Sequence, residues 1–106
     1  MKLAVIITQN NPEQVFTAMR FANFALKEGD AVSVFLTAEG VELEHLSNER
    51  FDICGQAESL VKAGGNIQAC GTCLKSRDAQ GSEICPSSTM QVMYTLVKES
   101  DRVVTF

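Results

Sequence analysis

The feature that most constrains the fold is an unbroken apolar segment near the start of the chain, followed by a helix-start signal. Residues 2–8 read Lys-Leu-Ala-Val-Ile-Ile-Thr, and such a run is typical of a strand buried on both faces of a parallel sheet. Asn11 suits a helix N-cap, Pro12 the first helical position and Glu13 the first turn. This pattern predicts a buried strand followed by a helix that ends near residue 28.

The rest of the chain repeats this alternation of strands and helices. The apolar runs and turn signals predict further strands over residues 31–37, 66–69 and 102–106. They predict further helices over about 53–63 and 89–99, and a short polar element over 38–50. Residues 70–81 are expected to form a loop, either irregular throughout or with one helical turn. A chain of 106 residues has room for one domain. We therefore expect a single α/β domain over residues 1–106, with a parallel sheet covered by helices on both faces.

Composition and charge exclude several classes of protein. The apolar share is 45% and the charged share 21%, which is ordinary for a globular protein and too apolar for a disordered chain. The apolar run at the start is far shorter than the roughly 18–20 residues of a membrane span, and no signal-peptide cleavage site follows it. Nine basic and thirteen acidic residues give a net charge of −4, which disfavours nucleic-acid binding. We expect a cytoplasmic protein with no nucleic-acid or membrane partner.

The predicted first helix is apolar over more than one face. One stripe at helical spacing is formed by Val15, Met19, Ala22 and Leu26. Phe16, Phe21 and Phe24 extend the apolar surface beyond that stripe. A helix that is apolar most of the way round is buried on more than one side, so we expect a second subunit to cover it. Isolated surface phenylalanines are the alternative.

The strongest chemical signal is the motif Cys70-Gly71-Thr72-Cys73, directly after the expected strand 66–69. In open α/β sheets, reactive groups gather beyond the carboxyl ends of the strands. Lys75 and Arg77 follow closely, and nearby cations favour the thiolate, which is the nucleophilic form of cysteine. The motif therefore predicts a reactive thiol.

The other cysteines and the histidine carry weaker signals. Cys54 lies on an expected helix and is interpreted as a packing residue. Cys85, in a loop, either packs or folds back toward the motif. A zinc site needs four ligands, commonly from paired knuckles, whereas this chain has one knuckle and a single histidine, His45, expected on the surface. Zinc or an iron–sulfur cluster therefore remains an alternative with poor spacing.

A dithiol–disulfide redox switch at Cys70 and Cys73 is a further alternative. Thioredoxin also places this motif between a strand and a helix, but the order of elements after Cys73 differs from the thioredoxin order. Neither a glycine-rich phosphate-binding loop nor a Ser-His-Asp set is recognisable.

Three segments together resemble the DsrE/DsrF-like family over the whole chain: Val5–Thr8, Gly65–Lys75 and Ser100–Phe106. The resemblance implies a small Rossmann-like or flavodoxin-like subunit that assembles into homo- or hetero-oligomers, often trimers or hexamers. In the sulfur-relay members, a cysteine after the central strand accepts sulfur as a persulfide and passes it to the next carrier. By position, that cysteine is Cys70.

A persulfide carrier needs an accessible thiolate, cations that stabilise the persulfide anion and a mobile loop. Cys70 is the expected thiolate, Lys75 and Arg77 the expected sulfur-binding cations, and Gly71 and Gly81 the source of flexibility. We therefore expect the Cys70 sulfur to be open to solvent at a subunit boundary.

The resulting hypothesis is a sulfur carrier, or sulfurtransferase-like subunit, that uses neither a cofactor nor a metal. Its expected partners are copies of itself, as a dimer, trimer or hexamer, and the proteins that donate and accept sulfur. Cys73 either resolves the persulfide or shapes the loop. The alternative hypotheses are the metal-binding module and the dithiol switch.

Overall fold

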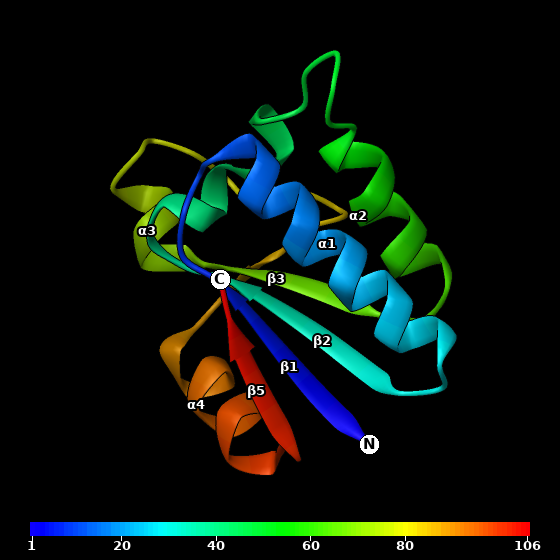
Figure 1. Cartoon of the computed structure of the whole chain (residues 1–106). Coiled ribbons are helices and arrows are strands. Elements are labelled where there is room, and N and C mark those ends of the chain that lie inside the picture. The colour runs from blue at the N-terminus through cyan, green and yellow to red at the C-terminus, as the bar shows by residue number, and fades with distance from the viewer.

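A five-stranded, all-parallel sheet forms the centre of the molecule in the computed structural model, which describes residues 1–106 (Figure 1). The strands are β1 (Lys2–Ile7), β2 (Ala31–Leu36), β3 (Asn66–Cys70), β4 (Ser87–Ser88) and β5 (Arg102–Thr105). Their order across the sheet is β4-β3-β2-β1-β5. Without the short β4, this order matches the first four strands of a Rossmann-type sheet.

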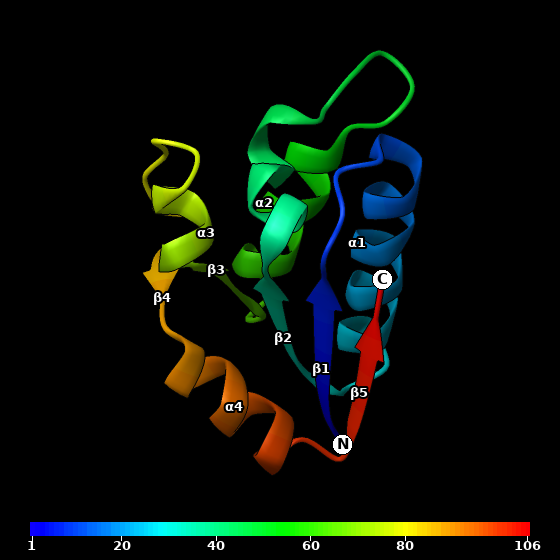
Figure 2. The ribbon, with the colours of Figure 1, turned by 90° about the vertical axis from the view of Figure 1, so that its left-hand side faces the viewer.

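Helices cover both faces of the sheet, as the sequence predicted. The helical segments are α1 (Pro12–Lys27), the 3-10 helix η1 (Ala38–His45), α2 (Ile53–Lys62), α3 (Gly71–Lys75) and α4 (Met90–Glu99). α1 and α2 lie side by side on one face, and α4 lies on the other (Figures 1 and 2). None of these helices combines the length and the apolar character needed to cross a bilayer.

Local capping accounts for the helix starts that the sequence predicted. The Asn11 side chain accepts a hydrogen bond from the backbone N–H of Gln14 at 3.1 Å, with Pro12 in the first position. The Thr89 hydroxyl accepts in the same way from Val92 at 3.3 Å. Each cap satisfies one of the backbone donors that a helix start leaves free.

The two faces of the sheet differ in polarity. Strand side chains alternate between faces, and the face under α1 and α2 is apolar, with eight buried residues: Leu3, Val5, Ile7, Val32, Val34, Leu36, Ile67 and Ala69. On the opposite face, Ala4, Ile6 and Phe35 are also buried, but Ser33, Asn66 and Gln68 make part of that face polar. Most of the core therefore lies between the sheet and the α1–α2 layer.

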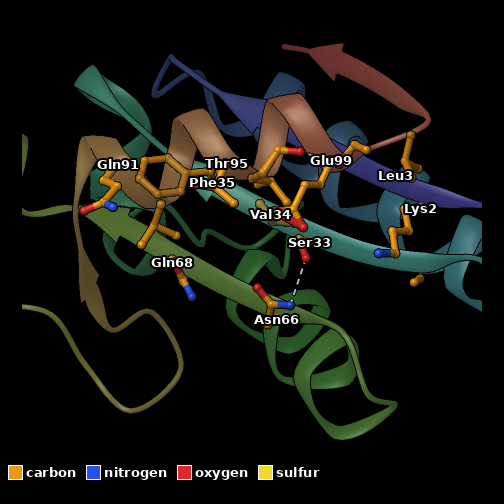
Figure 3. A pocket seen from close by; sticks show the side chains of 14 residues that line it. Lys2, Leu3, Ser33, Val34, Phe35, Asn66, Gln68, Gln91, Thr95 and Glu99 are labelled. Carbon is orange, nitrogen blue, oxygen red and sulfur yellow. Dashed lines mark hydrogen bonds between the residues drawn. The ribbon is translucent and has the colours of Figure 1, made fainter.

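A cleft of about 490 Å³ separates α4 from the polar face of the sheet (Figure 3). Its floor includes Ser33, which accepts a hydrogen bond from the Asn66 side chain at 2.9 Å, and its α4 wall includes Gln91 and Thr95. No residue of α4 is buried. This helix covers its face of the sheet only loosely.

β4 is the one strand that the sequence analysis did not predict. Ser87 and Ser88 pair in parallel with Ala69 and Cys70, and the N–H of Ala69 donates to the carbonyl of Pro86 at 2.9 Å. A strand of two residues has no periodicity to detect. It gives β3 a neighbour on its outer side, so Cys70 lies inside the sheet and not at its edge.

Gly71 and Gly81 make room for this strand, a different role from the flexibility expected of them. A Cβ atom on Gly71 would lie 2.9 Å from the Ser87 hydroxyl and 3.0 Å from the Ser88 carbonyl oxygen. A Cβ atom on Gly81 would lie 2.4 Å from the backbone nitrogen of Ser87. Both glycines therefore permit close backbone packing beside the cysteine motif.

We predict that Gly81→Ala lowers the free energy of unfolding by about 1–3 kcal/mol, because backbone must move to admit the methyl group. Urea denaturation followed by circular dichroism measures this change. Gln80→Ala, at the exposed neighbouring position, is the matched control and should change stability by no more than about 0.5 kcal/mol. Equal stability of the two variants would contradict the packing role of Gly81.

Candidate functional site

The cysteine motif lies where two neighbouring parallel strands end. β2 ends at Leu36, which pairs in register with Ala69, and β3 ends one residue later at Cys70. Because both strands run in the same direction, Thr37 and Ala38 emerge at the same edge of the sheet as the motif. The chain turns from β3 directly into α3, with Cys70 at the N-cap and Cys73 in the third helical position.

Cys70 is buried, with 4% of its surface exposed. The expectation that its sulfur is open to solvent is therefore wrong for this chain. Cys70 is the last residue of β3, it has β4 on its outer side, and it belongs to the hydrophobic core cluster. The motif was expected to be a loop, whereas its first cysteine belongs to the sheet.

Cys73 is the partly exposed thiol of the motif, and backbone and side-chain groups converge on its sulfur. The N–H of Ala38 donates a hydrogen bond to Cys73 Sγ at 3.2 Å, and the Thr37 hydroxyl lies 3.7 Å away. Ala38 has a φ of 51°, a left-handed conformation that costs a non-glycine residue about 1–3 kcal/mol. Such strained residues cluster at functional sites.

These contacts favour the thiolate of Cys73. Partial burial is the largest single influence and by itself raises the pKa of the Cys73 thiol. The Ala38 N–H, the Thr37 hydroxyl, the nearby Cys70 thiol and the positive charge of Arg77 together outweigh it. The net result is a Cys73 pKa below that of an ordinary cysteine.

Of the two predicted cations, Arg77 is the one that acts on Cys73. Its guanidinium donates to the Cys73 carbonyl oxygen at 3.1 Å through Nη1 and to the Glu42 carboxylate at 3.0 Å through Nε. Glu42 also accepts a hydrogen bond from Asn10 at 3.2 Å, and these contacts hold the pKa of its carboxyl below the usual range. Lys75 is exposed at the end of α3.

The remaining cysteines lie apart from this arrangement. Cys85 is buried, and burial together with the Glu44 carboxylate raises its pKa to about 12. Cys54 is part-buried on α2, and its thiol donates to the Glu44 carbonyl oxygen at 3.3 Å. His45 is exposed, as expected. No three His, Cys, Asp or Glu side chains converge as metal ligands, so the metal-binding alternative has no ligand set within one chain.

Sequence reasoning missed Thr37, Ala38, Glu42 and Asn10 as members of the site. One signal could have found the first two: Thr37 ends the predicted strand 31–37 and Ala38 follows it, and residues at the carboxyl ends of neighbouring parallel strands meet. Which strands are neighbours is a property of the tertiary structure. For Glu42 and Asn10, no pattern in the sequence marks their contact.

We predict that Cys73 is the fastest cysteine of the native protein to react with iodoacetamide, measured by peptide mass mapping across a pH series. A lowered pKa makes the thiolate available at lower pH, so the midpoint of its rate profile should lie below that of an ordinary cysteine. Thr37→Val should raise this midpoint, because the hydroxyl is lost. Thr72→Val, at an exposed position in the motif, is the control and should leave it unchanged. Faster modification of Cys70 or Cys85 would contradict the assignment.

Comparison with known proteins places this site in a family context. A model of the DsrE/DsrF-like family matches residues 1–106. An uncharacterized protein of Methanocaldococcus jannaschii is 34% identical over an alignment 114 positions long, which covers all of both chains. An uncharacterized protein of Methanopyrus kandleri is 34% identical over 100 residues, covering 89% of this chain and 83% of that protein.

The fold has a counterpart among solved structures. The crystal structure of the YchN protein of E. coli matches all of both chains with a TM-score of 0.86 at 20% identity. The family match spans the chain from its first residue to its last, and both relatives share a third of their residues with it. This chain therefore belongs to the DsrE/DsrF-like family.

Proposed function

We propose that this chain is a sulfur carrier in which Cys73 accepts a sulfane sulfur as a persulfide and passes it to a partner. Family membership supports sulfur-relay chemistry in general. The observation that carries the choice of residue is the partly exposed Cys73 sulfur, which accepts a hydrogen bond from the N–H of Ala38. The sequence analysis assigned the acceptor to Cys70, but a donor cannot reach a thiol buried in the core.

In the proposed reaction, the Cys73 thiolate attacks the outer sulfur of a donor persulfide. The new sulfur–sulfur bond forms at Cys73, the donor's own sulfur–sulfur bond breaks, and the donor leaves as a thiolate. An acceptor thiolate then attacks the outer sulfur held on Cys73, and Cys73 leaves as a thiolate. No external oxidant or reductant is needed for the transfer.

The surroundings of Cys73 suit the two anions that this cycle forms there, the thiolate and the persulfide. The Ala38 N–H and the Arg77 charge stabilise the thiolate that attacks and that later leaves. Arg77 also forms an ion pair with Glu42, so part of its charge is neutralised. The persulfide anion is therefore not stabilised so strongly that its outer sulfur cannot be transferred. Lys75, exposed on α3, is available to an acidic surface of the donor or acceptor protein.

We predict that reduced protein treated with inorganic polysulfide and then desalted gains the mass of one sulfur atom on Cys73. Because a thiol at that position is required, Cys73→Ser should lose the adduct. Cys54→Ser, which removes the other part-buried thiol, is the matched control and should take up the sulfur as the unmodified chain does. Intact mass and peptide mapping under non-reducing conditions measure the result.

The same measurement separates Cys73 from Cys70. If Cys73→Ser still gains the sulfur and Cys70→Ser does not, the acceptor is Cys70 and the assignment made here is wrong. If neither the unmodified chain nor Cys70→Ser gains sulfur, the carrier function itself fails.

The proposal includes self-association, because one chain leaves large apolar side chains uncovered. Phe24 of α1 is 63% exposed, and on α4 Met90 is 63% and Tyr94 66% exposed. A helix of ten residues is marginal in water unless its apolar face is packed, and α4 has no fully buried residue within this chain, with only Met93 and Leu96 packed partly against the core. We therefore propose that another subunit packs on α4, with donor and acceptor proteins as the other partners.

We predict that light scattering at several concentrations gives a mass larger than the 11.5 kDa of one chain. Tyr94→Asp should shift this mass toward that of the monomer, because a carboxylate on the covered face would be buried without a partner. Ser59→Asp, which adds the same charge at an exposed site on α2, should leave the mass unchanged. A monomeric unmodified chain would contradict the proposal.

A further inference from the structure

We propose that Cys70 is a resolving thiol that discharges the sulfur carried on Cys73 as sulfide, leaving a Cys70–Cys73 disulfide. This inference rests on the proposed persulfide at Cys73. It gives the buried cysteine of the motif a chemical role and provides the carrier with a second product, free sulfide, when no acceptor protein takes the sulfur.

The local geometry places the two cysteines at the same helix start. Cys70 is the N-cap of α3 and Cys73 its third residue, and an N-cap side chain normally folds back toward the third residue of its helix. The side chain of Cys70 makes no capping hydrogen bond, so its thiol is not committed to the helix backbone. It lies near enough to the Cys73 sulfur to help lower the pKa of that thiol.

The spacing also suits the product. Residues three apart on one helical turn are neighbours, with about 5–6 Å between their Cβ atoms. A disulfide tolerates Cα–Cα separations of about 4.4–6.8 Å and needs slightly closer Cβ atoms. The conformation of Cys70, with φ −59° and ψ 118°, places it outside the helix proper as its N-cap residue.

Burial gives the step its selectivity. Cys70 is 4% exposed, so thiols, oxidants and sulfur donors in solution do not reach it. Cys73, on the same helical turn, is only partly buried. Cys85, the other buried thiol, does not compete because its raised pKa of about 12 keeps it protonated. Cys70 therefore reacts only with what Cys73 carries.

The step balances as follows. Cys70 gives up its proton and attacks the inner sulfur of the persulfide, the one bonded to the Cys73 Cβ atom. The Cys70–Cys73 sulfur–sulfur bond forms, the bond to the outer sulfur breaks, and the outer sulfur leaves as hydrosulfide, which takes the proton. The sulfane sulfur is reduced to sulfide and the two cysteines are oxidised to the disulfide. A dithiol reductant or a small thiol must then reduce the disulfide before another cycle.

The experiment compares the unmodified chain with Cys70→Ser, Cys70→Ala and the matched control Cys54→Ser. Each reduced protein is loaded with inorganic polysulfide, desalted and incubated in dilute solution without any thiol. Released sulfide is measured with monobromobimane, and intact mass is followed over the same period. Circular dichroism establishes that each variant is folded.

We expect the unmodified chain and Cys54→Ser to lose the added sulfur, release one equivalent of sulfide and end two hydrogens lighter than the reduced protein. Peptide mapping should find the disulfide between Cys70 and Cys73. Both Cys70 variants should hold the added sulfur and release sulfide at roughly one tenth of the rate of the unmodified chain, or more slowly, because no internal thiol reaches Cys73.

Two results would overturn the inference while leaving the carrier function intact. In one, the loaded unmodified chain keeps its sulfur and forms no disulfide, a result that does not depend on any variant being folded. In the other, folded Cys70 variants release sulfide as fast as the unmodified chain. Failure of the unmodified chain to take up sulfur at all would instead refute the proposed function, and the discharge step with it.

Discussion

The parallel pairing of β2 with β3 is the contact on which the candidate site depends. It brings the turn after β2, with the N–H of Ala38, against the sulfur of Cys73 in the turn after β3. Cys73 is near the carboxyl edge because of its place in the chain, but its pKa is lowered mainly by the Ala38 N–H and the Thr37 hydroxyl, which are more than thirty residues away in the sequence. Cys70 and Arg77, close by in the sequence, add to this effect. The turns after β2 and β3 thus produce a thiol with a lowered pKa only because the sheet places them side by side.

The change from strand to helix within the motif divides its two cysteines into different environments. Cys70 completes β3 and belongs to the core, whereas Cys73, one helical turn later, lies partly in solvent. Gly71 makes this change possible, because β4 passes too close to admit a side chain there. Four consecutive residues therefore provide one thiol that partner proteins can reach, that of Cys73, and one that only a neighbouring group can reach, that of Cys70.

Much of the fold could be predicted because its signals are local. Asn11 and Thr89 cap their helices through side chains within three residues, and the buried strands are continuous apolar runs. The burial of Cys70 could not be predicted, because it depends on β4, whose two residues carry no pattern. The contacts of Cys73 with Ala38 and of Arg77 with Glu42 were equally inaccessible, since they join segments through the tertiary structure.

The loose seating of α4 has a consequence for the site, although the helix does not touch Cys73. Because α4 has no fully buried residue and packs on the core only through partly buried side chains such as Met93 and Leu96, its local unfolding exposes less apolar surface, and costs less free energy, than opening the α1–α2 layer. β4 precedes α4 by a single residue and forms the outer neighbour of Cys70. The burial of Cys70 therefore depends on a strand that is connected directly to α4, the helix without a fully buried residue. A subunit that packs on α4 also stabilises β4 and keeps Cys70 buried.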